Sequence, residues 1–117
     1  MTKIIFVGDE PGRLNLNKDI AFVGAKSFET LISWIKTIQP DYYVCLNSHT
    51  PENLDKINAL YNADFKVVAL GNKASNRLKK LNIEHYKLPH PSGLNRQLND
   101  VAKLNLDLKH CKYYIGL

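Results

Sequence analysis

The sequence predicts an α/β fold, a three-layer α/β/α arrangement in which helices cover both faces of a mostly parallel, four-stranded central sheet. Two observations carry this prediction. Short runs of β-branched and apolar residues alternate with amphipathic runs of helical periodicity. The first apolar run, Lys3–Val7, shows no polar alternation, which is typical of a central strand buried on both faces. Strands that alternate with helices form right-handed βαβ units, and such units build parallel sheets.

Four stretches are predicted as strands, and each ends at a turn that contains polar residues, glycine or proline. They are residues 3–7, 41–46, 65–70 and 83–88. A further apolar stretch, Ile20–Gly24, is predicted as either a small extended piece or part of a binding wall.

Helical periodicity predicts four helices. They cover residues 27–38, 51–61, 73–81 and 94–108. We expect Ser27 to cap the first helix, and Thr50 and Pro51 to supply the N-cap and the first residue of the second. The C-terminal stretch, Lys109–Leu117, is expected to form a docking tail or a further short strand.

Length and composition favour an ordinary soluble globular protein. The 117 residues predict a single domain, residues 1–117, and 44% of them are hydrophobic, which is enough for one core without a metal or a disulfide. Cys45 and Cys111 lack the spacing of a zinc or iron–sulfur site, and Cys45 is expected to be a buried thiol. We therefore expect no metal and no cofactor.

Charge and hydropathy bear on location and partners. No apolar stretch approaches the roughly 20 residues of a membrane helix, and no signal-peptide pattern is present, so we expect a cytoplasmic monomer without membrane contact. The net charge of +5 is compatible with a polyanionic partner, although many proteins without one are equally basic.

The segment Leu88–Arg96 contains a histidine between two prolines. Pro89 and Pro91 restrict the backbone around His90 and favour extended geometry there. A histidine on a stiff loop after a strand is well placed for chemistry. The alternative is an exposed histidine in a tight turn.

Polar residues gather where the predicted strands end. In an open α/β sheet, ligands bind beyond the carboxyl ends of the strands. The four turns at this edge carry Asp9-Glu10-Pro11-Gly12, Asn47-Ser48-His49, Gly71-Asn72 and His90-Pro91-Ser92. A carboxylate pair, an asparagine amide and a histidine are therefore expected at one edge of the sheet. The glycines of the first turn form neither a G-x-G-x-x-G motif nor a P-loop, so no nucleotide cradle is predicted.

Five segments, in order, resemble motifs of the uracil-DNA glycosylase superfamily. They are Val7–Gly12, Ala21–Gly24, Cys45–Asn47, Val67–Gly71 and His90–Arg96. The first is similar to the family's G-x-x-P-[GY] loop. The last is similar both to the H-P-S of uracil-specific members and to the N-P-S-G-L-S-R of mismatch-specific members. Each motif is short, and it is their order and spacing over residues 3–100 that carry the resemblance.

The resemblance implies a DNA glycosylase that flips uracil, or a related modified pyrimidine, out of the base stack and hydrolyses its N-glycosidic bond. Glu10 would orient or deprotonate the attacking water, with Asp9 as the competing assignment. The family usually has Asp or Asn where Glu10 stands, so this chain departs from the family pattern by a longer side chain. His90 would donate a hydrogen bond to the negative charge that develops on the departing base.

The resemblance also implies contacts to the base and to DNA, single- or double-stranded. Asn47 would pair with O4 and N3–H of uracil, and Phe22 would stack on the base or be an ordinary core residue. Leu94 would be the wedge that fills the gap left by the flipped base, or the first core residue of the last helix. The DNA backbone would be held by Pro11, Gly12, Ser92, Asn95 and Arg96.

The chain is short for this family, and it lacks the cysteines that hold an iron–sulfur cluster in some branches. Two alternatives to the glycosylase therefore stay open. One is a degenerate module that binds a base, a nucleotide, DNA or a partner protein without turnover. The other is an enzyme acting on free nucleotides or modified bases. The polar residues of the third helix are expected to form a solvated face, with DNA tracking as the alternative: Lys73, Asn76, Arg77, Lys79 and Lys80.

Overall fold

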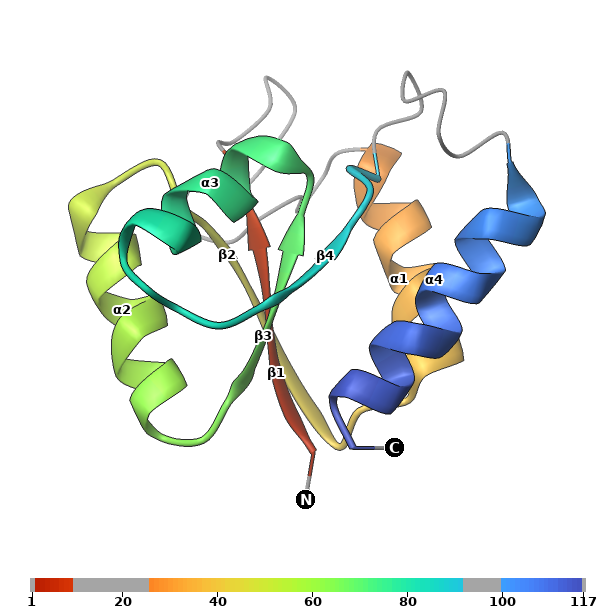
Figure 1. Ribbon diagram of the computed structural model, residues 1–117, viewed down its shortest axis with the longest axis horizontal. Helices are drawn as coiled ribbons and strands as arrows, with labels where there is room; N and C mark the ends of the chain where they lie inside the picture. The colour runs from red at the N-terminus through yellow and green to blue at the C-terminus, as the bar shows by residue number, and fades with distance from the viewer. Residues whose placement is uncertain (1, 10–25, 92–99, 117) are drawn as a thin grey trace.

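The computed structural model describes residues 2–9, 26–91 and 100–116, in which strands and helices alternate (Figure 1). The strands are Lys3–Gly8 (β1), Tyr42–Asn47 (β2), Lys66–Leu70 (β3) and Tyr86–Leu88 (β4). The helices are Lys26–Ile38 (α1), Pro51–Asn62 (α2), Asn72–Lys80 (α3) and Val101–Tyr114 (α4).

The four described strands form one sheet in the order β2-β1-β3-β4, and every neighbouring pair is parallel. Figure 1 shows α2 and α3 on one face of this sheet and α1 and α4 on the other. The predicted three-layer α/β/α fold with a four-stranded parallel sheet is therefore confirmed. Because the strands are parallel, their carboxyl ends meet at a single edge.

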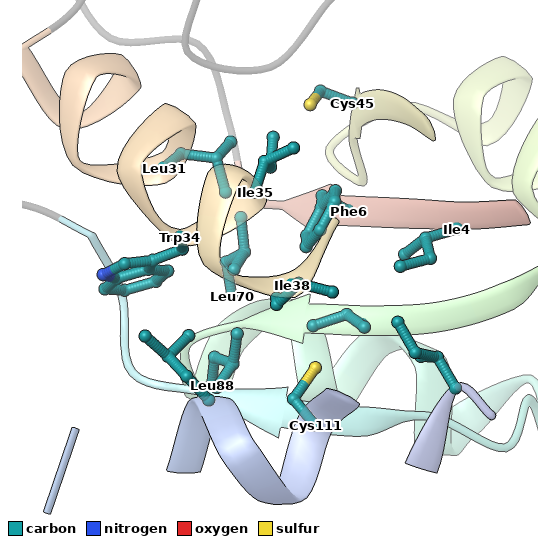
Figure 2. Packing of buried hydrophobic residues seen from close by; sticks show 13 residues of the cluster. Ile4, Phe6, Leu31, Trp34, Ile35, Ile38, Cys45, Leu70, Leu88 and Cys111 are labelled. Carbon is teal, nitrogen blue, oxygen red and sulfur yellow. The ribbon is translucent and has the colours of Figure 1, made fainter. Parts of the chain in front are cut away.

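Alternate residues of β1 fill two hydrophobic cores. Ile4 and Phe6 belong to the core between the sheet and α1 and α4, which Figure 2 shows. Ile5 and Val7 belong to the core between the sheet and α2 and α3. All four side chains are 0% exposed, and full burial of such a side chain contributes roughly 1.5–3 kcal/mol to folding. The unbroken apolar sequence of β1 thus reflects its burial on both faces.

The predicted N-cap residue is confirmed for α2 and is wrong for α1. The Thr50 hydroxyl accepts a hydrogen bond from the backbone N–H of Asn53 at 3.2 Å, and Pro51 is the first helical residue, which confirms the predicted start of α2. The predicted cap of α1 is wrong, because this helix already includes Lys26 and Ser27 therefore lies inside it.

The predicted C-terminal tail is also wrong, because α4 continues to Tyr114 rather than ending near Leu108. Leu108, Cys111 and Ile115 recur at helical spacing and are buried in the core that α4 shares with α1. Because these side chains are buried when the segment is helical, the helix continues through residues whose sequence favours a tail or a strand. In the described residues α4 begins at Val101, and the predicted start at Leu94 lies outside them.

Both cysteines are buried in this core, as expected for Cys45. Burial raises the pKa of the Cys45 thiol to about 12 and that of Cys111 to about 12, so both stay protonated at neutral pH. Neither is therefore suited to act as a nucleophile. In the part of the chain that the structure describes, no helix is both long and apolar enough to cross a membrane.

Gly71 joins β3 to α3 in a backbone conformation that is restricted to glycine. Its φ is +95° and its ψ is 174°, a region that residues with a Cβ essentially never occupy. Its N–H donates to the carbonyl oxygen of Leu88 at 2.9 Å. A Cβ at this position would lie 3.2 Å from the Cβ of His90. The close approach of the β3–α3 turn to the loop after β4 therefore requires glycine.

Gly71→Ala is expected to lower the free energy of unfolding by roughly 1–3 kcal/mol, because it forces a strained backbone and crowds His90. Gly116→Ala is the matched control, since Gly116 also has a positive φ, of +91°, but nothing lies within 4 Å of the place that a Cβ would take there. Without such crowding it is expected to have a smaller effect. Urea unfolding of both variants measures the difference, and equal losses would contradict the proposed contact.

Candidate active site

Polar groups from three strand ends and a glycine turn lie at the carboxyl edge of the sheet. They are Asp9 after β1, Asn47 at the end of β2, Gly71 after β3 and His90 after β4. Eight of the other predicted site residues lie outside the described residues: Glu10, Pro11, Gly12, Phe22, Ser92, Leu94, Asn95 and Arg96.

Asn47 is a buried amide at this edge. Its side chain is 0% exposed, and within the described residues neither Nδ2 nor Oδ1 has a hydrogen-bond partner. Leaving a buried polar group unpaired costs about 1–3 kcal/mol of stability. Asn47 follows Cys45 by two residues, so it lies on the sheet face that α1 covers. A buried amide with both donor and acceptor available is well suited to bind a planar polar ligand.

His90 is half-buried on the loop after β4. Burial lowers the pKa of His90 from its ordinary value of 6.5, and the carboxylate of Asp9 acts in the opposite direction. The net shift is downward, which favours the neutral imidazole, with its one N–H donor, at pH 7. Its Cβ and Cα pack on Gly71, which fixes the base of the side chain.

The strand order determines how far apart these two side chains are. Asn47 ends β2 and His90 packs on the residue after β3, so β1 lies between them. Neighbouring strands are about 4.8 Å apart, and two such spacings separate the anchoring points by roughly 10 Å. Asp9 lies in this interval, and its field reaches His90. Asn47 and His90 therefore flank the end of β1.

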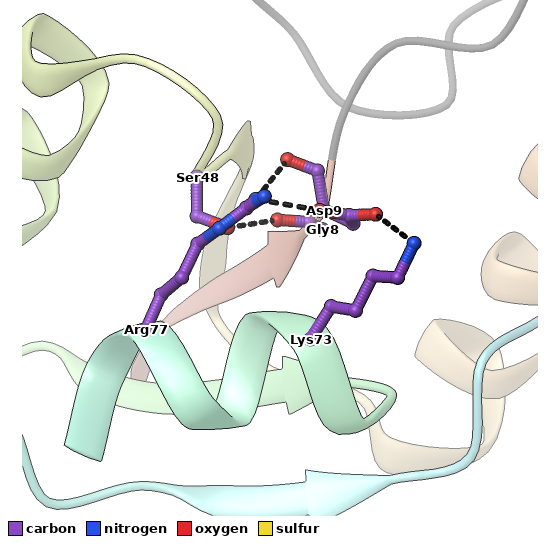
Figure 3. Close-up of polar contacts among 5 residues, drawn as sticks. All are labelled: Gly8, Asp9, Ser48, Lys73 and Arg77. Carbon is purple, nitrogen blue, oxygen red and sulfur yellow. Dashed lines mark hydrogen bonds and ion pairs between the residues drawn. The ribbon is translucent and has the colours of Figure 1, made fainter. Parts of the chain in front are cut away.

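A cluster of polar residues is built around Arg77 of α3 (Figure 3). Its Nη1 donates to the backbone carbonyl of Asp9 at 2.9 Å and to Oγ of Ser48 at 3.1 Å, and pairs with the Asp9 carboxylate at 2.5 Å. Lys73 forms a longer ion pair with that carboxylate, at 3.8 Å. The hydroxyl of Ser48 donates to the carbonyl of Gly8 at 2.7 Å. We call these five residues, Gly8, Asp9, Ser48, Lys73 and Arg77, the Arg77 cluster.

The Arg77 cluster changes the interpretation of two sequence features. The solvated face predicted for α3 is correct for Asn76, Lys79 and Lys80, which are exposed, but wrong for Arg77, which is half-buried and turned toward β1. Ser48 has a structural role that sequence reasoning missed. For Arg77 the available sequence signal was weak, because it consisted only of a lysine and an arginine four residues apart on one helix face.

A cavity of about 370 Å³ lies on the α4 side of His90. Its described walls are mostly polar: Lys87, His90, Lys103 and Asp107 contribute side chains, and Lys87 donates to Oδ1 of Asn72 at 2.9 Å. Asn47 is not among the described walls. Across residues 2–9, 26–91 and 100–116, no group of three His, Cys, Asp or Glu side chains is arranged to hold a metal ion.

The chain was compared with protein families, curated proteins and solved structures. The model of the Uracil DNA glycosylase superfamily matches residues 1–109. No curated protein and no solved structure matches. The family match covers nearly the whole chain, and it includes β1, β2, β3 and β4 together with the loops that follow them. With its parallel α/β sheet and the polar groups at the carboxyl edge, the chain belongs to the uracil DNA glycosylase superfamily.

Proposed function

We propose that the protein is a DNA glycosylase that hydrolyses the N-glycosidic bond of uracil, or of a related modified pyrimidine, after the base is flipped out of the DNA. Membership of the superfamily supports a glycosylase. The observation that carries the proposal is the buried Asn47 amide, which has no partner within the described residues and lies across the end of β1 from a neutral His90.

Asn47 is the proposed base-reading residue. Uracil presents an acceptor at O4 and a donor at N3–H, which match the Nδ2 donor and the Oδ1 acceptor of an asparagine. Cytosine presents the reverse pattern, a donor at N4 and an acceptor at N3. Each mismatched group would stay buried and unpaired at a cost of about 1–3 kcal/mol, which is roughly 5- to 150-fold in affinity. In the orientation that pairs with uracil, Asn47 would therefore disfavour cytosine.

His90 is the proposed donor to the departing base. As the glycosidic bond breaks, negative charge develops on the uracil, and a preoriented N–H stabilises it. The prolines on both sides of His90 and its packing on Gly71 hold the ring in place before the reaction. A preorganised donor of this kind contributes on the order of 10²–10³ in rate.

Glu10 is the proposed residue that orients the attacking water, and it also offsets the positive charge on the sugar. Asp9, the competing candidate, has its carboxylate engaged by Arg77 and Lys73, which favours Glu10 for this role. Phe22 is proposed to stack on the base, and Leu94 to fill the gap that it leaves. The remaining DNA contacts are assigned to Pro11, Gly12, Ser92, Asn95 and Arg96.

The purified protein is expected to leave alkali-labile abasic sites in uracil-containing oligonucleotides. His90→Ala should lower the single-turnover rate on the order of 10²–10³-fold because it removes the N–H donor, and Glu10→Ala should also lower it because it removes the group proposed to orient the water. His110→Ala, which removes an exposed histidine of α4, is the matched control and should retain the wild-type rate. A folded protein that excises nothing from a panel of uracil, modified-pyrimidine and mismatched substrates would favour a binding module without turnover.

The neutral state of His90 has a consequence for stability. Because its pKa is lowered in the folded protein, the unfolded chain binds more protons as the pH falls, so folding is destabilised by acid. This contribution is fully present above the unfolded pKa of 6.5 and is lost as the pH falls toward the lower folded value. Urea unfolding at pH 5 to 8 should show a steeper acid loss for the wild type than for His90→Asn, with His110→Asn following the wild type. Parallel curves for all three proteins would contradict a lowered pKa.

A further inference from the structure

The Arg77 cluster joins the two strand ends that precede the proposed base pocket. Arg77 projects from α3, the helix that packs on the sheet face occupied by Ile5 and Val7. Asp9 follows Val7 by two residues and therefore points to the same face. In Figure 3 the arginine and Lys73 reach from one helix toward the end of β1.

A single guanidinium holds both strand ends. The carbonyl of Asp9 accepts from Arg77 at 2.9 Å and from the backbone N–H of Ser48 at 3.1 Å. The carbonyl of Gly8 accepts from both the hydroxyl and the N–H of Ser48, at 2.7 and 2.9 Å. The backbone after β1 and the backbone after β2 are therefore bonded to each other directly and again through Arg77.

The chemistry of this contact requires arginine. The guanidinium is planar, remains charged and presents several N–H donors in a fixed geometry, so one group can serve a carboxylate, a carbonyl and a hydroxyl together. A lysine would keep the charge but lose this geometry. The side chain of Arg77 is 34% exposed and that of Asp9 is 16% exposed, so water competes weakly with the pair.

We propose that Arg77 is a positioning residue for base excision: it fixes the ends of β1 and β2, and with them Asp9 and the residue that precedes Ser48. That residue is Asn47, the proposed base reader. The proposal rests on the proposed function, because Arg77 acts through its neighbours rather than on the base.

Arg77 also acts on the charge of the site. The Asp9 carboxylate favours the charged form of His90, and Arg77 and Lys73 both pair with that carboxylate. The other charged groups that line the cavity beside His90 in the described residues are Lys87 of β4 and Lys103 and Asp107 of α4. Removing Arg77 would therefore shift His90 toward its protonated form and release the ends of β1 and β2 at the same time.

The test compares Arg77→Lys and Arg77→Met with Lys56→Met, which removes an exposed cation from α2. Both Arg77 variants are expected to lower kcat on a uracil-containing oligonucleotide on the order of 10–100-fold with little change in KM, since small displacements of reacting groups have effects of this size. Arg77→Met should also move the histidine-dependent limb of the pH–rate profile upward. Lys56→Met should behave like the wild type.

If the Arg77 variants do not fold, Ser48→Ala provides a second test. This variant removes one hydrogen bond of the Arg77 cluster and should also lower kcat, by a smaller factor.

Two results would overturn the proposal. A folded Arg77→Met variant with an unchanged kcat would show that the role of Arg77 is purely structural. A loss confined to KM and to salt-dependent DNA binding would make Arg77 a phosphate contact instead.

If the wild type excises no base, the proposed function fails, and NMR then decides the positioning claim separately. Arg77→Met, but not Lys56→Met, should shift the side-chain amide signals of Asn47 and raise the titration midpoint of His90. Unchanged signals and an unchanged midpoint would overturn the claim.

Discussion

The central position of β1 is the constraint on which the site depends. This strand pairs with β2 on one edge and with β3 on the other, and its side chains fill both cores. Its last residues therefore cannot move without disturbing the packing of all four helices. Asp9 directly follows this strand and lies between Asn47 and His90, where it pairs with Arg77 of α3. The polar edge is thus anchored on a central strand that is close-packed on both faces.

The same edge contains features that a fold selected for stability alone would avoid. Asn47 is buried with no hydrogen-bond partner within the described residues, and Gly71 adopts a backbone conformation restricted to glycine beneath His90. Unpaired buried groups and restricted backbone conformations are concentrated at functional sites, where the rest of the structure compensates for them. Their coincidence at the carboxyl ends of the strands supports a binding site there.

The sequence predicts most of this architecture because its signals are local. The uninterrupted apolar run of β1 and the Thr50 cap of α2 depend on neighbouring residues alone, and the structure confirms both. The C-terminal end of α4 was mispredicted because Tyr113-Tyr114-Ile115 has strand-like composition, whereas burial of Ile115 against the core favours the helix. The role of Arg77 could not be predicted, because it depends on the strand order that places α3 beside the end of β1. Asn47 is predicted as a site residue from its place at a strand end, but the lack of a hydrogen-bond partner for its amide within the described residues is visible only in three dimensions.

We infer that Asn47 is buried for recognition rather than for stability, and a paired measurement of stability and activity on Asn47→Leu tests this inference. An apolar side chain of similar branching removes the unpaired amide. The free energy of unfolding is therefore expected to stay the same or to rise by up to about 1–3 kcal/mol, while single-turnover uracil excision falls on the order of 10²-fold. A variant that loses stability but still excises uracil at the wild-type rate would show that the amide serves the fold, and would contradict its assignment as the base reader.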